Sequence, residues 1–195
     1  MTCTIGRAHY ASQETVLKVM KELIQAFTQI ALLRRGPQDL PASRLLLGLT
    51  MMAYFGVCLV VISLMPPLQG WEEHPAIDIL FWLVWYFVVL RLAGRSERIL
   101  QTTTAVIGFQ TILAAPLVIS DWLMLRFAKD ETWQLPVALM WLMLFIWMIA
   151  ANSHVVKAAF EWSSFASVAL VILQIFAGQL LMMALFAPMT PGTTG

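Results

Sequence analysis

The most constraining feature of this sequence is an uninterrupted apolar run, residues 45–65, in which no side chain carries a charge. A helix needs about 20 predominantly apolar residues to cross a hydrocarbon core about 30 Å thick. Four further apolar runs follow it, at residues 76–92, 102–119, 135–151 and 165–186. Five runs of this kind predict a protein that crosses a membrane five times.

Composition agrees with that prediction, because 60% of the 195 residues are hydrophobic and only 12% are charged. A soluble domain has roughly 45–50% apolar and 25% charged residues. The runs lack the alternation of a membrane β-barrel, and a helix satisfies its own backbone groups in lipid. The predicted fold class is therefore all-α: a polytopic membrane helical bundle over residues 45–186, preceded by an amphipathic helix at the cytosolic interface.

The distribution of Lys and Arg predicts the orientation. If the N-terminus is cytosolic, ten of the 12 basic residues fall inside, and only Arg126 and Lys129 fall outside. Because short cytosolic segments carry the excess of positive charge, this arrangement is favoured. We therefore expect a multi-pass protein of a bacterial inner membrane whose short C-terminal tail, residues 187–195, is periplasmic.

The arm before the first run, residues 1–44, contains a predicted amphipathic helix at residues 14–35. Its apolar side chains recur at helical spacing, and Gly36 with Pro37 ends the pattern. They are Val16, Met20, Leu23, Ile24, Phe27, Ile30 and Ala31. The helix is expected to lie on the cytosolic leaflet or to dock beneath the bundle, and the alternative is a helix that binds a partner.

The sequence contains none of the catalytic motifs that we sought, and it therefore predicts a protein that is not an enzyme. There is no Gly-rich phosphate loop, no serine-hydrolase elbow and no Cys-x-x-Cys pair. The histidines at positions 9, 74 and 154 are too scattered for a metal or haem site, so no cofactor is expected. Net charge of +1 gives no indication of nucleic-acid binding.

Acidic residues surround the start of the second run, in the sequence WEEHPAID. Glu72, Glu73, His74 and Asp78 are of the types that could form a weak divalent-cation site. The interpretation we favour is a solvated turn on the outer side, with Asp78 close enough to the end of its helix to reach the interface.

Basic residues at the predicted cytosolic boundary are the candidates for contacts with lipid head groups or partner proteins. They are Lys18, Lys21, Arg34, Arg35, Arg91, Arg95, Arg98, His154 and Lys157. The ordinary interpretation is that they mark the water boundary and fix the orientation. Lys157 and Glu161 are also spaced to pair along one helix face.

Within the runs the strongly polar residues are Gln110, Gln174 and Gln179. Glutamines in membrane helices bond neighbouring helices together, which is the interpretation we favour. The alternative is a polar path for a transported solute. Thr104 and Gly108 form a small-xxx-small pair, and Gly108 is a candidate point of close packing.

One segment carries a family resemblance: "SERILQTTTAVIGFQTILAAPLVI", with Gly94, Arg95, Gln101, Thr102 and Pro116 at and around it. Together with "NSHVVKAAFEWSSFASVALVIL" and the five-span pattern, it resembles the Yip (Ypt-interacting protein) membrane superfamily over residues 45–186. The resemblance implies membrane organisation or scaffolding through partners. It carries over no catalytic residue.

The sequence therefore predicts a non-enzymatic membrane protein that acts as a scaffold or accessory subunit. Its expected partners are membrane lipids and other membrane protein subunits, and one specific form is an accessory subunit of a respiratory or photosynthetic complex. The alternative is a transporter or channel for a small or apolar solute.

Overall fold

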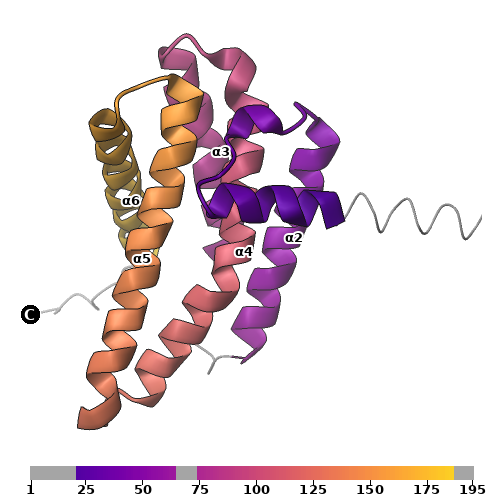
Figure 1. Cartoon of the computed structure of the whole chain (residues 1–195). Coiled ribbons are helices and arrows are strands. Elements are labelled where there is room, and N and C mark those ends of the chain that lie inside the picture. Colours follow the sequence, from indigo (N-terminus) through magenta and orange to yellow (C-terminus); the bar gives the residue numbers. More distant parts are fainter. Residues whose placement is uncertain (1–20, 65–73, 187–195) are drawn as a thin grey trace, which may run out of the picture.

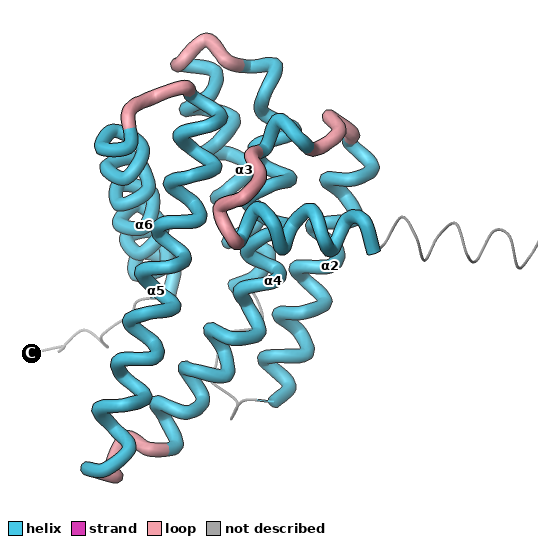
Figure 2. The backbone as a smooth tube through the Cα atoms, viewed as in Figure 1, coloured by secondary structure: helices cyan, strands magenta, loops and turns pink. Residues whose placement is uncertain are grey.

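A computed structural model describes residues 21–64 and 74–186, and those residues contain helices and no strand. The predicted all-helical fold is confirmed, and five helices are long and apolar enough to cross a membrane. A leading helix (residues 21–31) comes first (Figures 1 and 2). The elements that follow are η1 (Pro37–Asp39), α2 (Arg44–Leu64), α3 (His74–Leu92), η3 (Ser96–Arg98), α4 (Ile99–Arg126), α5 (Glu131–Phe160) and α6 (Ser164–Phe186).

Two of the five helices extend well past the apolar runs that predicted them. α4 has 28 residues and α5 has 30, so at about 1.5 Å per residue each is more than 40 Å long. α5 begins where Asp130 caps it, because the Asp130 carboxylate accepts hydrogen bonds from the backbone N–H groups of Thr132 and Trp133 at 3.0 and 3.4 Å. The polar residues after position 151 continue the helix instead of ending it.

α4 is the central helix of the bundle. Every residue from Thr102 through Gln110 is buried, which means that this half of α4 is covered on all sides. The elements that pack against α4 are α2, α3, α5 and η1, and Phe27 of the leading helix is in contact with it as well.

The leading helix lies across the bundle instead of running along it (Figures 1 and 2). The Phe27 ring sits against Gly108 of α4, where a Cβ atom would overlap it. The indole Nε1 of Trp147, on α5, donates to the backbone oxygen of Ala31 at 2.9 Å. Ile30 is fully buried, whereas Ile24, expected on the same apolar face, is 59% exposed. The predicted positions Val16, Lys18 and Met20 lie outside the described residues.

A short return connects the leading helix to α2. Leu33 adopts a left-handed backbone conformation (φ 61°), and η1 then brings the buried Leu40 against the bundle. The Gln101 Nε2 of α4 donates to the Leu40 oxygen at 2.8 Å. α2 starts immediately after Ser43, whose hydroxyl accepts from the Leu46 N–H at 3.3 Å.

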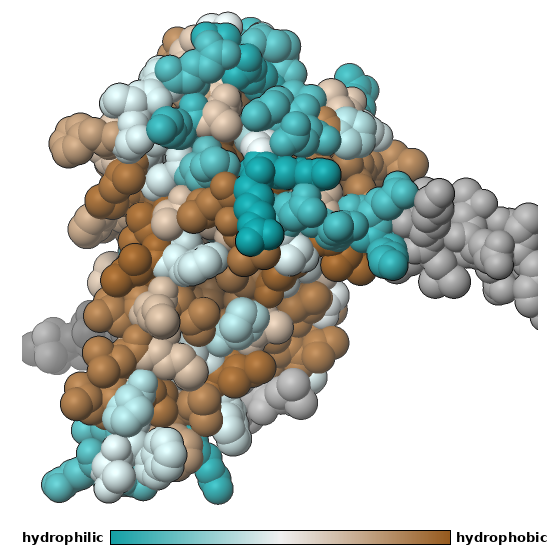
Figure 3. Space-filling model, viewed as in Figure 1, coloured by the Kyte–Doolittle hydropathy of each residue, from teal (hydrophilic) through white to brown (hydrophobic). Residues whose placement is uncertain are grey.

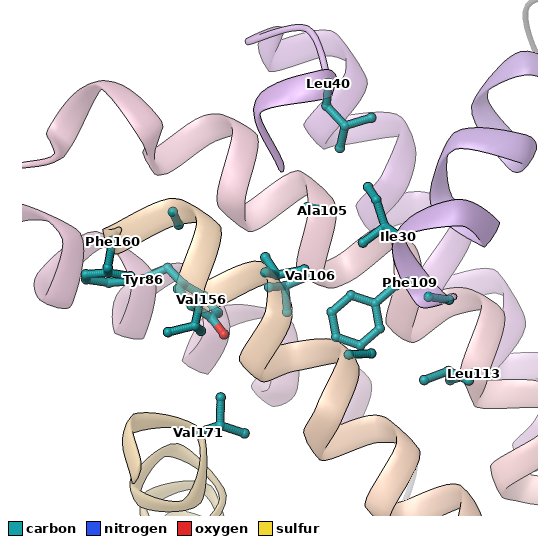
Figure 4. Close-up of a cluster of buried hydrophobic side chains, with 14 of the residues drawn as sticks. Ile30, Leu40, Tyr86, Ala105, Val106, Phe109, Leu113, Val156, Phe160 and Val171 are labelled. Carbon is teal, nitrogen blue, oxygen red and sulfur yellow. The ribbon is translucent and has the colours of Figure 1, made fainter. Parts of the chain in front are cut away.

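The largest cluster of buried apolar side chains joins the leading helix, η1 and α3 to α6 (Figure 4). Ile30 and Leu40 reach it from the N-terminal segment, and Val106 and Phe109 from α4. The outer surfaces of the long helices are also apolar. On the face seen in Figure 3, hydrophobic side chains form a broad band between two polar ends, which is the distribution that a lipid-facing surface requires.

Candidate functional site

Three polar side chains from three helices meet inside the bundle and form a polar triad (Tyr86, Asn152 and Gln174). The Tyr86 hydroxyl, from α3, lies 2.8 Å from Asn152 Oδ1 of α5 and 2.8 Å from Gln174 Oε1 of α6. Asn152 Nδ2 donates to Gln174 Oε1 at 3.4 Å. All three side chains are buried. Interhelical hydrogen bonds of this kind in membrane proteins contribute roughly 1 kcal/mol each, so the triad ties α3, α5 and α6 together.

The Tyr86 hydroxyl cannot donate to both amides of the triad at once. A tyrosine hydroxyl has one proton and can therefore donate to only one of the two amide oxygens. A phenol and two amides carry no charge at neutral pH, and their contacts hold three helices together.

One member of the triad lies just beyond the apolar run that predicted its helix. Asn152 directly follows the apolar run 135–151 in the sequence. In the structure α5 continues to Phe160, and Asn152 faces the core. The signal that could have identified its partner was Tyr86, a hydroxyl within the apolar sequence WYFVV.

Hydrogen bonding near the triad is incomplete within the described part of the chain. The side-chain hydroxyl of Ser153 and the indole nitrogen of Trp85 are buried without a partner there, as are the hydroxyls of Thr102 and Thr104 on α4. Ser153 and Trp85 are direct chain neighbours of triad members. Near the triad, some buried polar groups are therefore hydrogen-bonded within the described residues and others are not.

The other two glutamines lie in different surroundings. Gln110 lines a cavity between α2, α3, α4 and α5, and Gln179 is exposed on the outer surface of α6. Gln174 is committed to the triad. The structure thus places the three predicted intramembrane residues in three separate settings and not along one path.

Arg95, Arg98 and Glu161 form an ion-paired cluster, the arginine clamp, where two interhelical loops meet. Arg95 Nη2 lies 2.5 Å from Glu161 Oε2, and Arg98 Nη2 lies 2.6 Å from Oε1. The Arg98 Nη1 atom also donates to the backbone oxygens of Ala158 and Ala159, at 3.0 and 3.1 Å. Those carbonyls belong to the last turn of α5, where a positive charge is favourable.

The clamp accounts for an unusual backbone conformation and a shifted pKa. Glu161 ends α5 in the left-handed region, at φ 58°, a conformation that residues other than glycine adopt infrequently. Hydrogen bonds from Arg98 and Arg95, with their positive charges, hold the pKa of Glu161 below its ordinary value. Lys157, which is spaced so that it could pair with Glu161, instead donates to the Ser164 hydroxyl at 3.0 Å.

The turn that carries the clamp arginines is formed by Gly94. Its φ of 71° places it in the left-handed region that glycine adopts readily. The Arg95 N–H donates to the Leu90 oxygen at 2.8 Å, and the Gly94 N–H donates to the Arg91 oxygen at 3.1 Å. This is the Schellman pattern that closes a helix, and it turns the chain from α3 into η3.

The remaining basic candidates are on the surface. Lys21, Arg34, Arg35 and Arg91 are exposed and His154 is half-buried, while Lys18 lies outside the described residues. The Arg91 guanidinium carbon is 5.6 Å from the centre of the Phe87 ring. Among the described members of the predicted contact set, Arg95, Arg98 and Lys157 are thus held by bonds within the chain.

Two aspartates that sequence reasoning did not single out for these roles lie between helices. The Asp78 carboxylate, on α3, is 3.4 Å from the Tyr54 hydroxyl of α2 and lines the same cavity as Gln110. Asp78 was expected to reach the interface; it points into the bundle because α2 and α4 flank this side of α3. Asp121 of α4 accepts a hydrogen bond from the Trp141 indole of α5 at 2.8 Å.

No group of three or more metal-ligating side chains occurs among residues 21–64 and 74–186. Glu72 and Glu73, considered above as cation ligands, lie outside those ranges. His74 begins α3, and His154 is near the end of α5, so the two positions belong to opposite ends of the bundle.

No protein-family model, no curated protein and no solved structure matches this chain.

Proposed function

We propose that this chain is a non-enzymatic membrane protein that serves as a scaffold or accessory subunit by binding partner membrane proteins or lipids. The observation that carries the proposal is Gln179. Its amide is exposed on α6, a helix whose outer surface is otherwise apolar. An amide facing hydrocarbon is unfavourable unless a neighbouring helix supplies a hydrogen bond. A helix of another subunit would meet that requirement.

The rest of the molecule is consistent with such a role. The polar groups of the triad form hydrogen bonds with one another between helices, so these groups are not available to bind a substrate. The exposed cations at one end, Lys21, Arg34, Arg35 and Arg91, are suited to anionic lipid head groups. Membership of the Yip superfamily, as the sequence resemblance implies, is part of the proposal and predicts the same class of function.

The direct test is a photo-reactive residue introduced at position 179 or, as a control, at position 173. Leu173 is also exposed, at 57%, but lies about 120° around the same helix. We expect a discrete adduct with one partner protein from position 179 and none from position 173. Gln179→Leu should reduce co-purification of that partner from mild detergent.

The proposal would be overturned by a monodisperse monomer that yields no protein adduct from either position. The transporter alternative predicts something different: solute flux into liposomes that stops when Gln174 and Gln179 are changed to Leu in a folded protein. Because the three glutamines lie in separate settings, the geometry favours the scaffold.

We also propose that the chain lies in a bacterial inner membrane with the leading helix in the cytosol and the C-terminal tail in the periplasm. Support comes from the concentration of Lys and Arg at the end of the bundle that holds the arginine clamp. In a background without Cys3 and Cys58, Lys129→Cys should react with an impermeant maleimide added outside, and Glu97→Cys should not. The reverse labelling would invert the orientation.

A further inference from the structure

A cavity of about 270 Å³ lies between α2, α3, α4 and α5, towards the end of the bundle opposite the arginine clamp. Its size is close to the lower end of the roughly 300–1,000 Å³ of small-molecule pockets. Four of its lining residues carry polar groups, Tyr54, Cys58, Asp78 and Gln110, and they come from three different helices. The remaining walls are apolar or aromatic.

Among the described lining residues, the only side chain that can carry a full charge near neutral pH is an acid. Asp78 is the one ionisable carboxylate among the lining residues, and no Lys, Arg or His is among them. The Tyr54 hydroxyl approaches it at 3.4 Å, a long distance for an O–H···O bond. Residues 65–73, between α2 and α3, contain two glutamates and no basic residue. The Asp78 carboxylate therefore has no cation in the described cavity to balance it.

An aromatic surface lies one turn along the same helix face. Trp82 follows Asp78 by four residues, so the two side chains are neighbours on α3, and both line the cavity. The Tyr54 and Trp82 rings pack in a T-shaped arrangement, with the ring centres 5.1 Å apart. A carboxylate beside an indole face attracts an organic cation by charge and by cation–π interaction together.

Other classes of ligand fit the cavity less well. An anion would be repelled by Asp78 and would find no basic partner among the described lining residues. A calcium ion takes six to eight oxygen ligands, and a single carboxylate with one phenol and one amide supplies too few. A neutral apolar molecule would fill the space and leave the carboxylate unpaired in apolar surroundings.

We propose that this cavity binds an ammonium group carried on a small apolar body, with the nitrogen between the Asp78 carboxylate and the Trp82 ring. The apolar body would lie against Leu117, Val118 and Met148, which line the other side. Gln110 offers an amide to a second polar group of the ligand. The proposal does not depend on the scaffold role, because a bound amine neither requires nor excludes a partner subunit.

Two sources supply this chemistry: the head group of phosphatidylethanolamine, or a free hydrophobic amine. The first experiment uses the full chain in a maltoside detergent and 4-fluorobenzylamine as the probe, followed by 19F NMR line broadening. The neutral control is 4-fluorobenzyl alcohol, which has the same shape without the positive charge. We expect saturable binding of the amine and at least about tenfold weaker binding of the alcohol.

Two variants test the site itself. Asp78→Asn keeps the side-chain volume and removes the charge, and should weaken binding of the amine about tenfold or more. Ala114→Phe places a ring in the cavity and should abolish binding with Asp78 intact. The matched control is Asp121→Asn, which removes a carboxylate elsewhere between helices and should leave binding unchanged. Size-exclusion profiles show that each variant is folded.

Equal binding of amine and alcohol, equal effects of Asp78→Asn and Asp121→Asn, or the absence of any saturable amine binding would each overturn the proposal. The source is distinguished by competition with lipids of matched acyl chains. Displacement of the probe by phosphatidylethanolamine but not by phosphatidylglycerol identifies the lipid head group. Saturable probe binding that neither lipid displaces identifies a free amine.

Discussion

The two ends of the bundle differ in how their polar side chains are arranged. At the end with the α3–α4 and α5–α6 loops, polar side chains form short hydrogen bonds between several helices. At the opposite end, polar side chains line a cavity. We call these the clamp end and the cavity end. At the clamp end the Tyr86 hydroxyl is 2.8 Å from each of two amides. At the cavity end the Tyr54 hydroxyl is 3.4 Å from its carboxylate. Two tyrosines on neighbouring helices thus make contacts of very different quality.

The difference indicates which end of the bundle is held by more buried contacts between helices. The clamp end combines the triad, the arginine clamp, and a stretch of α4 that is buried on all sides. Towards the cavity end, α4 and α5 extend past these contacts, and residues 128–136 are exposed. Regions with few buried contacts open most easily and are where ligand binding is generally found. We therefore expect substitutions to affect stability at the clamp end and binding at the cavity end.

The largest loss of stability is expected from Gly108→Leu. Its side chain would overlap the Phe27 ring, and overpacking of this kind costs roughly 1–3 kcal/mol. The free energy of unfolding, from steric trapping in bicelles, should fall towards the upper part of that range. Amides of residues 21–31 should also exchange faster with solvent.

The matched control for that change is Gly56→Leu on α2, because a Cβ at Gly56 meets no atom within 4 Å. Its stability should change little. Adding Phe27→Ala to Gly108→Leu should recover part of the loss. Equal effects at the two glycines would show that the leading helix is not held at Gly108.

The two tyrosines allow the same chemical change at both ends. Tyr86→Phe leaves two buried amides without their hydroxyl, which we expect to lower the free energy of unfolding by about 1–2 kcal/mol. Tyr54→Phe loses only a long bond beside a cavity, and its effect should stay below about 0.6 kcal/mol. Unfolding titrations in mixed micelles measure both, and a larger loss for Tyr54→Phe would contradict the comparison.

Trp141→Phe tests whether the length of a hydrogen bond or its location in the bundle determines how much it stabilises the fold. The Trp141–Asp121 bond is short, at 2.8 Å, but it joins only two helices towards the cavity end. We expect a loss of about 0.6 kcal/mol, the average for interhelical hydrogen bonds in a membrane protein. Trp133→Phe, at an exposed tryptophan, is the control. A loss as large as that of Tyr86→Phe would make bond length, and not the enclosed position, the cause.

Glu161→Gln should give the smallest effect, because the clamp is on the surface and exposed ion pairs contribute little. The native pKa of Glu161 is lowered, so the clamp's contribution is complete above the unfolded glutamate pKa of about 4.3 and is lost as pH falls through the native value. The melting temperature of the native chain should therefore decline over that acidic window more than that of the variant. Parallel curves would show that the ion pairs do not stabilise the fold.

The sequence was sufficient to predict the helices because hydropathy is a local property. Each apolar run, such as 45–65, is long enough to specify a helix without knowledge of its neighbours. Helix ends were predicted less well. The apolar run 135–151 stops before Asn152, but α5 continues because the Asn152 side chain bonds to Tyr86 and Gln174 in the core.

The contacts that define the two ends were beyond sequence reasoning. Tyr86 and Asn152 are 66 positions apart, and no periodicity within one helix encodes which residue of another helix it meets. The cavity around Asp78 needs residues of four helices, so it exists only in the packed bundle. The arginines of the clamp were recognised for their charge, but their acceptor, Glu161, was considered only as a possible partner of Lys157.

The crossing of the leading helix over α4 and α5 has a consequence for biosynthesis. Residues 21–31 leave the ribosome well before Gly108 and Trp147, yet Phe27 and Ala31 are held by those two residues. The earliest of the described segments to be translated is therefore among the last to reach its final position. Until α5 has been made, the Trp147 indole that bonds to Ala31 is missing, and the leading helix cannot complete its docking.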